Sequence, residues 1–167
     1  TDKTMFKASV DGKEVFLKLT AGNSSDVSNY IVEMLEAEPM QQDIKIDMKD
    51  AIDRDGKIAL YGILFDVNKA TIKSESEKTL QTVIEYLVSN KSVKIIVVGH
   101  TDNTGVFASN ITLSKERAKA VVEFLVTKGK IDYSRLMPEG VGSLCPVATN
   151  TTDAGRILNR RVEIVRQ

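Results

Sequence analysis

Hydrophobic and polar positions predict a small β-rich region at the start of this chain. Residues 5–20 alternate in two short segments around Asp11-Gly12, a pair typical of a tight hairpin turn. Residues 22–25 predict a loop. Residues 29–37 predict a third strand, although part of this segment also fits a helix, and Pro39 should end it. We therefore expect a three-stranded meander.

Helical and strand patterns alternate in the rest of the chain. A short helix is predicted over residues 47–54, with Gly56 as its stop. Ser74-Glu75-Ser76-Glu77 has the spacing of a capping box and precedes an apolar helical stripe: Leu80, Val83, Ile84 and Leu87. A second helix has the stripe Ala118, Val121, Val122 and Leu125 and should stop at Gly129. Strands are expected at 57–65, 93–98, 135–141 and 159–165.

The order of these elements predicts an α/β (α+β) fold. In the order β-α-β-α-β-β, two helices would cover one face of a mixed sheet. We place a boundary before this region. Residues 1–55 then form a β-meander extension to which we assign no function, and residues 56–167 form the main domain.

A carboxylate and a guanidinium are predicted to meet at one end of this sheet. The apolar run 93–98 leads into a turn with Asp102, and the next helix carries Asn110, Leu113 and Arg117 on one stripe. Such a pair suits a zwitterion, because the aspartate accepts from an ammonium and the arginine binds a carboxylate. The same spacing also fits an ordinary structural ion pair.

Several motifs occur together in a consistent order. They are Phe65-Asp66-x-Asn68-Lys69-Ala70, Gly99-His100-Thr101-Asp102-Asn103-x-Gly105, Asn110-x-x-Leu113-Ser114-x-x-Arg117-Ala118 and Asn150-x-Thr152-x-x-Gly155-Arg156-x-x-Asn159-Arg160-Arg161-Val162. This set resembles the OmpA-like C-terminal domain family, which includes the peptidoglycan-associated lipoprotein and the periplasmic domain of the flagellar stator. The resemblance covers about residues 56–166, roughly two thirds of the chain.

The resemblance implies a non-catalytic protein that binds peptidoglycan without a covalent bond, through the diaminopimelate of the stem peptide. It implies that Arg117 holds the diaminopimelate carboxylate and that Asp102 accepts from its ammonium. Asn110 and backbone amides around Asn103 would complete the hydrogen bonding, and Leu113 would form a wall of the cleft. The implied role is to anchor the outer membrane or an envelope complex to the cell wall.

The other expected cleft residues are Asp66, Asn68, Thr101 and one of Arg160 or Arg161. Strand alternation would place the two arginines on opposite faces, so only one would face the ligand. The chain departs from the family pattern at Val67, where many relatives have a small hydroxyl residue. We therefore expect no side-chain contact with the ligand from that position.

Composition argues against several other functions. The 23 Lys and Arg residues balance 23 Asp and Glu residues, so the basic excess of nucleic-acid-binding proteins is missing. One His and one Cys give neither a transition-metal site nor a nucleophile–base set, so we expect no metal, no cofactor and no enzyme activity.

The resemblance also implies a periplasmic location, associated with the outer membrane of a Gram-negative bacterium. The chain begins Thr1-Asp2-Lys3, without a signal peptide or a lipidatable Cys, so we expect a processed or truncated form. Membrane attachment would come only from a missing N-terminal lipid anchor. The alternative is an envelope interaction module that uses the edge of the 5–20 hairpin for a partner strand or a second copy. The oligomeric state is left open.

Overall fold

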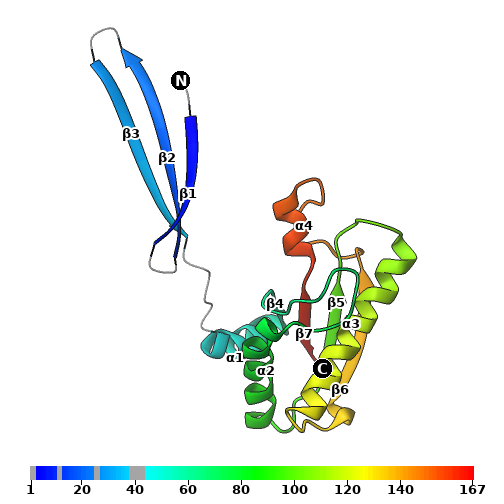
Figure 1. Ribbon diagram of the computed structural model, residues 1–167. Coiled ribbons are helices and arrows are strands. Elements are labelled where there is room, and N and C mark those ends of the chain that lie inside the picture. The colour runs from blue at the N-terminus through cyan, green and yellow to red at the C-terminus, as the bar shows by residue number, and fades with distance from the viewer. Residues whose placement is uncertain (1–2, 11–12, 25–26, 38–43) are drawn as a thin grey trace. The chain divides into compact units, whose positions relative to one another are not determined.

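The computed structural model describes residues 3–10, 13–24, 27–37 and 44–167. The chain forms two compact units, Thr1–Gln42 and Asp43–Gln167, which are described separately (Figure 1). Helix α1 thus belongs to the second unit, whereas our sequence boundary placed its residues with the N-terminal extension.

The first unit is an antiparallel sheet with the order β1-β2-β3. Its strands are β1 (Lys3–Val10), β2 (Lys13–Ser24) and β3 (Val27–Ala37), so the predicted meander is confirmed. The predicted turn at Asp11-Gly12 and the stop at Pro39 lie outside the described residues.

The loop predicted at residues 22–25 is wrong from Gly22 to Ser24. These residues continue β2 and pair with β3, with Gly22 opposite Asn29 and Ser24 opposite Val27. Their low strand propensity is outweighed by the long antiparallel ladder in which they take part, because strand propensity depends strongly on context.

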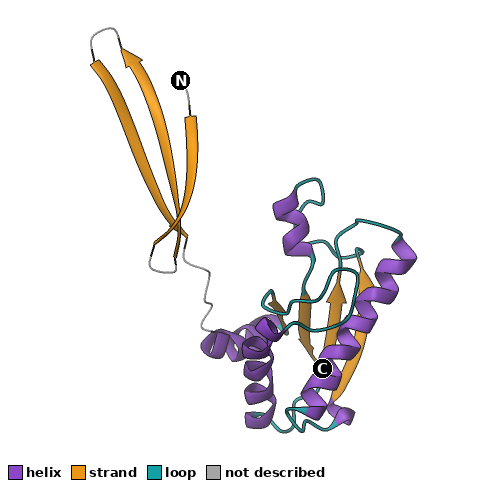
Figure 2. Ribbon diagram, viewed as in Figure 1, coloured by secondary structure: helices purple, strands orange, loops and turns teal. Residues whose placement is uncertain are grey.

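The second unit contains a mixed sheet with the order β4-β7-β5-β6 (Figure 2). Its strands are β4 (Lys57–Leu60), β5 (Ile95–His100), β6 (Leu136–Gly142) and β7 (Val162–Arg166). Only β5 and β6 are parallel; β4 and β5 each pair antiparallel with β7. The predicted fold class is confirmed, and β5 and β6 lie within two residues of their predicted positions.

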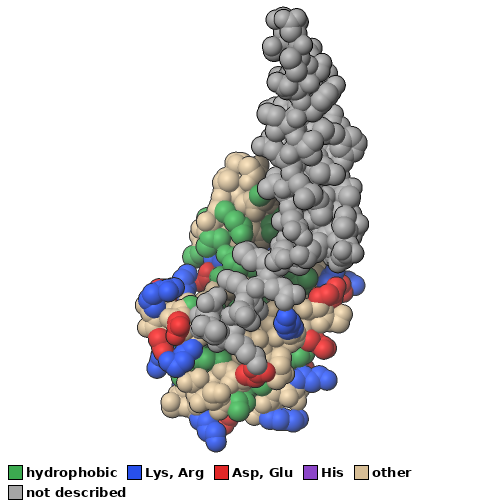
Figure 3. Space-filling model, turned by 90° about the vertical axis from the view of Figure 1, so that its left-hand side faces the viewer, with side chains coloured by type: hydrophobic (Ala, Val, Ile, Leu, Met, Phe, Trp, Pro, Cys, Tyr) green, Lys and Arg blue, Asp and Glu red, His purple; other side chains and the backbone are tan. Residues whose placement is uncertain are grey.

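Four α-helices accompany this sheet. They are α1 (Ile44–Asp55), α2 (Glu77–Ser89), α3 (Phe107–Thr127) and the short α4 (Asp153–Asn159). Short 3₁₀ segments, η1 (Ser74–Ser76) and η2 (Tyr133–Arg135), precede α2 and β6. The apolar stripes predicted for α2 and α3 are buried in one core with the strands. On the face of the second unit in Figure 3, basic and acidic side chains are interspersed.

Helix α1 contributes to the core of the second unit. Met48 and Ile52 are each 1% exposed and belong to the core cluster. The helix ends where predicted: Gly56 has a φ of +72° and its amide donates to the Ile52 carbonyl. A positive φ is available to glycine at little cost, so Gly56 reverses the chain into β4.

We expect Ile52→Ala to lower the free energy of unfolding of the second unit by about 2–5 kcal/mol, because it leaves a cavity in the core. Urea unfolding followed by circular dichroism measures the change. The exposed Asp50 on the same helix is the control, since Asp50→Ala should change this free energy by less than about 0.5 kcal/mol. If Ile52→Ala unfolds at the same urea concentration as the parent, α1 is not part of the cooperative unit.

Three predicted boundaries are wrong. Strand β4 ends at Leu60 rather than at residue 65. The chain continues as a loop, in which Phe65 forms an isolated antiparallel bridge with Ile72. The capping box does not form: the Ser74 hydroxyl donates to the Glu75 carboxylate at 3.0 Å, residues 74–76 form η1, and α2 begins at Glu77. The Ser76 hydroxyl, at the N-cap position of α2, bonds the amide and carbonyl of Leu64. The last strand begins at Val162 rather than residue 159, since the preceding residues form α4.

Candidate functional site

A cleft of about 410 Å³ lies where β5 ends, between α3, the loop after β4 and the segment that joins α4 to β7. Eight of the ten predicted site residues line it: Asp66, Asn68, Thr101, Asp102, Asn110, Leu113, Arg117 and Arg160. Asn103 and Arg161 do not. Val67 also lines the cleft and is exposed.

Asp102 is the fixed anion of this cleft. The residue is 7% exposed. Its Oδ1 accepts from the Thr104 amide at 2.9 Å and its Oδ2 accepts from Arg160 Nη1 at 2.6 Å. Burial opposes ionisation, but the hydrogen bonds from Arg160 and then Thr104 outweigh it and hold the pKa of Asp102 below 3.8. The side chain is therefore ionised and oriented at neutral pH.

Arg117 is the cation that faces the same cleft. It is half-buried on α3, its Nε donates to the Lys69 carbonyl at 3.0 Å, and its guanidinium lies 5.0 Å from the centre of the Phe65 ring. Burial, followed by the nearby charge of Arg160, lowers the pKa of Arg117 from its ordinary value, although an arginine keeps its charge in proteins. These contacts hold the guanidinium at the cleft.

The two charges of the cleft do not pair with each other. Asp102 forms its ion pair with Arg160, and no ion pair joins Arg117 to a carboxylate within the described part of the chain. The sequence was also compatible with a structural ion pair between Asp102 and Arg117. This ion pair does not form. Arg117 remains able to bind an anion from outside the protein.

Asn110 and Thr101 position the loop that carries Asp102. Asn110 is buried, and its amide donates to the carbonyls of Thr104 at 3.0 Å and Asp102 at 3.4 Å. The Thr101 hydroxyl also donates to the Asp102 carbonyl, at 2.8 Å. Both side chains therefore hydrogen-bond the backbone of this loop and so help to orient the Asp102 carboxylate.

A hydrogen-bond network around Asn159 positions Arg160. Asn159 is fully buried; its Oδ1 accepts from the amides of Val147 and Ala148, and its Nδ2 donates to Asn150 Oδ1 at 2.9 Å. Asn150 Oδ1 also accepts from the Asn103 amide at 3.3 Å. Asn103, which was predicted to bind the ligand and does not line the cleft, thus connects the Asp102 loop to the segment before α4.

Helix α4 is absent from the predicted elements, although the motif over residues 150–162 contains its residues. The Thr152 hydroxyl caps the helix by accepting from the Gly155 amide at 3.1 Å, and Asp153 lies in the first turn. A Cβ on Gly155 would lie 1.9 Å from the Thr149 carbonyl oxygen, so only glycine fits there. The signal was present: a threonine followed by an acidic residue is typical of a helix N-terminus.

Only one of the two candidate arginines lines the cleft, but strand alternation is not the reason. Arg160 follows α4 and points to Asp102 before β7 begins. Arg161 is buried, pairs with Glu163 at 2.7 Å and donates to the Cys145 carbonyl at 3.1 Å. The end of a short helix, rather than the pleat of a strand, separates the two side chains.

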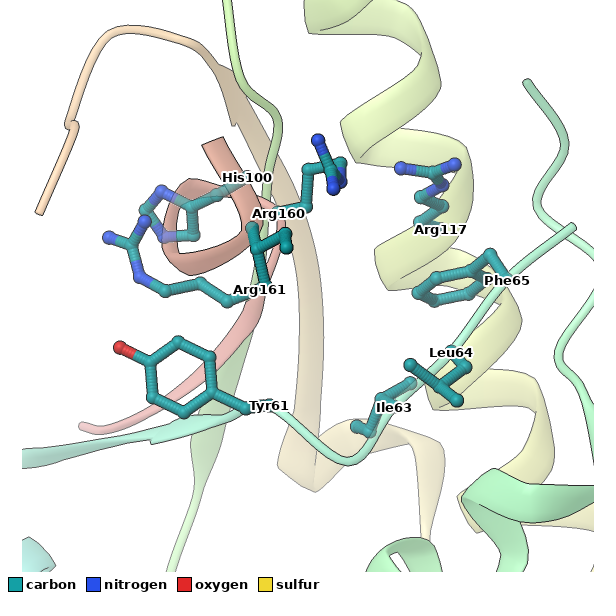
Figure 4. Close-up of a pocket in the computed structure, with 9 residues that line it drawn as sticks. Tyr61, Ile63, Leu64, Phe65, His100, Arg117, Arg160 and Arg161 are labelled. Carbon is teal, nitrogen blue, oxygen red and sulfur yellow. The ribbon is translucent and has the colours of Figure 1, made fainter. Parts of the chain in front are cut away.

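A second cavity of about 210 Å³ adjoins the cleft (Figure 4). Phe65, Arg117 and Arg160 line both, and the remaining lining residues are Tyr61, Ile63, Leu64, His100, Ile157 and Arg161. His100 is 4% exposed, and neither ring nitrogen has a hydrogen-bond partner in the structure. Burial, and then the charge of Arg161, lower its pKa to about 4, so this side chain is neutral at pH 7.

We expect His100 to make the protein less stable as the pH falls from 7 to 5. The unfolded chain binds a proton with a pKa near 6.5 whereas the folded chain does so only near 4, so acid favours unfolding across this window. The expected loss is about 1–2 kcal/mol in the free energy of unfolding. Urea titrations at several pH values measure it, and because the chain has one His, His100→Phe should flatten the profile. An unchanged slope in this variant would contradict the assignment.

Comparison with known proteins gives the family. Residues 64–160, more than half of the chain, match the model of the OmpA family. The chain belongs to the OmpA family. Outer membrane protein A of Bordetella avium is 45% identical over 100 residues, which cover 60% of this chain and 51% of the relative. Peptidoglycan-binding protein ArfA of Mycobacterium tuberculosis is 38% identical over 103 residues, which cover 62% of this chain and 31% of that protein. The chain thus spans about half or less of these relatives.

Solved structures of OmpA-like domains share this fold. The peptidoglycan-associated lipoprotein of Burkholderia pseudomallei is 27% identical with a TM-score of 0.57, and the match covers 63% of this chain and 88% of that one. The cell wall anchor of the T6SS from Pseudomonas aeruginosa is 27% identical with a TM-score of 0.56, covering 72% and 94%. In the described residues, no helix has the length and apolarity needed to cross a membrane, and no three His, Cys, Asp or Glu side chains are grouped to hold a metal.

Proposed function

We propose that this OmpA-family chain binds peptidoglycan without a covalent bond, through the diaminopimelate of the stem peptide. Asp102 accepts from the ammonium at the free end of diaminopimelate, and Arg117 binds the carboxylate on the same carbon. One observation carries this proposal: the two side chains line one cleft, carry opposite charges and form no ion pair with each other.

The hydrogen-bonding capacity left in the cleft fits such a ligand. The two Asp102 oxygens offer about four acceptor sites, of which Thr104 and Arg160 use two. The Arg117 Nε bonds a carbonyl, which leaves the two terminal nitrogens directed to the cleft for a bidentate carboxylate. Leu113 and Phe65 supply apolar wall around these groups, and a less hydrated site strengthens charge–charge attraction.

The names of the relatives support a cell-wall role. One relative is named as peptidoglycan-binding, and the two matched structures are named as a peptidoglycan-associated lipoprotein and a cell wall anchor. Another is named as an outer membrane protein. We infer that this chain works in the periplasm and anchors the outer membrane or an envelope complex to the wall, as a binding protein rather than an enzyme.

Sedimentation with purified, protein-free sacculi tests the proposal. The parent chain should enter the pellet, and free meso-diaminopimelate in excess should release it into the supernatant. The double variant Asp102→Asn/Arg117→Gln keeps a polar side chain at each position but removes both charges, and it should stay in the supernatant while melting like the parent. A parent chain that does not sediment, or that is not released by the amino acid, would exclude this function.

The first unit supports a second candidate function, an envelope interaction module. Among the described residues, β1 and β3 each pair on one side only, so the sheet has two open edges. Such edges accept a further strand. Analytical ultracentrifugation tests the simplest case: a chain beginning at Asp43 should be monomeric where the full chain forms dimers. Identical behaviour of both chains would exclude pairing between copies.

A further inference from the structure

The cavity beside the cleft contains a buried polar group with nothing to bind. Buried side-chain nitrogens in proteins almost always have a hydrogen-bond partner, so one that lacks it requires an explanation. His100 is 4% exposed, lines this cavity, and neither of its ring nitrogens is bonded. The carboxylate of Glu163 lies 3.7 Å from Nε2 of His100, beyond hydrogen-bond distance, and Glu163 is already bonded to Arg161 and Lys57. A neutral imidazole offers one donor and one acceptor to whatever enters the cavity.

The rest of the lining defines the chemistry of that occupant. Figure 4 shows His100, Tyr61 and Arg161 at one end of the cavity and Leu64 and Phe65 at the other, with Arg117 and Arg160 above. Three guanidinium groups favour an anion, and the aliphatic and aromatic side chains favour a small apolar substituent. Arg161 and Arg160 are already paired with Glu163 and Asp102, so Arg117 is the lining guanidinium that has no carboxylate partner among the described residues.

We propose that this cavity is a second subsite, which binds the carboxyl-terminal residue that follows diaminopimelate in the stem peptide. The inference rests on the proposed function. The peptide bond to that residue offers an N–H donor on one side and a carbonyl acceptor on the other, and either of them can bond one ring nitrogen of His100. Its small side chain packs on Leu64 and Phe65, and its terminal carboxylate lies in the field of the arginines. Because Phe65, Arg117 and Arg160 line both hollows, one ligand can occupy them together.

Two synthetic peptides test this subsite: L-Ala-γ-D-Glu-meso-diaminopimelate, and the same peptide extended by D-alanine. The parent chain should bind the extended peptide about tenfold more tightly by calorimetry, the effect of one or two added hydrogen bonds. The His100→Phe variant keeps a planar ring without nitrogens and should lose most of this preference. Tyr61→Glu places a negative charge at the His100 end of the cavity and should remove the preference, whereas the neutral Tyr61→Gln should reduce it less.

The shorter peptide separates the two proposals. Its affinity depends on Asp102 and Arg117, so it should change little in the His100 and Tyr61 variants. If the parent binds both peptides equally, or if Tyr61→Glu and Tyr61→Gln retain the same preference, the second subsite is excluded and the diaminopimelate site stands. If neither peptide binds the parent, the proposed function fails and the subsite with it. The exposed Tyr61 pair keeps the test valid even if His100→Phe does not fold.

Discussion

Arg117→Ala will weaken binding of diaminopimelate-containing muropeptides by about tenfold to over a hundredfold, because a charge-assisted hydrogen bond contributes about 1.5–3 kcal/mol. The loss should lie near the upper end of that range, since Arg117 forms no competing ion pair in the described structure. Asp102→Ala should have a similar effect, and it also leaves the Arg160 guanidinium unpaired beside the ligand ammonium. Isothermal titration with soluble muropeptides measures both changes.

Control variants show whether weaker binding comes from the lost charge or from a loss of folded structure. Lys119→Ala removes an exposed cation from the same helix, away from the cleft, and should leave the affinity unchanged. Arg117→Lys keeps the charge but loses the bidentate geometry, so it should fall between the parent and Arg117→Ala. Melting curves show whether each variant is folded. Folded Asp102 and Arg117 variants that bind like the parent would place the site elsewhere on the molecule.

The sequence predicted elements whose signal is local and strong. The apolar stripes of α2 and α3 appear in the core, together with Ile95 and Val97 of β5, because a repeated pattern over many residues tolerates local exceptions. The Gly56 stop was also predictable, since a glycine after a helix commonly takes a positive φ. Predictions failed where a distant contact determines the local structure. Ser76 bonds Leu64 and does not cap α2, and only the folded chain shows that these residues are neighbours.

The candidate site was predictable as a set of residues and not as a set of contacts. Helical spacing placed Asn110, Leu113 and Arg117 on one stripe, and all three line the cleft. The partner of Asp102 could not be predicted, because Arg160 is 58 residues away and reaches it only through α4. The role of Asn159 was hidden for the same reason: its four hydrogen bonds link it to a loop that contains no periodic pattern.

A second large effect is expected in the choice between peptidoglycan types. Lysine at the same stem position has the ammonium but lacks the adjacent carboxylate, so Arg117 would face the ligand without its partner. A site built around a polar group of its ligand rejects an analogue that lacks that group far more strongly than one that lacks a methylene. We expect the parent chain to bind a lysine-type muropeptide about a hundredfold more weakly than its diaminopimelate counterpart, which corresponds to about 3 kcal/mol.

The same comparison in the Arg117→Ala variant assigns that selectivity to one side chain. Without the guanidinium, the extra carboxylate of diaminopimelate has no partner and adds no affinity. The diaminopimelate-type and lysine-type muropeptides should therefore bind with similar, weak affinities. The cycle formed by two proteins and two ligands then gives the coupling between Arg117 and the carboxylate directly. In Asp102→Ala the preference should persist, because the ammonium that this residue binds is common to both ligands. Equal affinity of the parent for both muropeptides, or a preference that survives in Arg117→Ala, would remove Arg117 from the recognition of diaminopimelate.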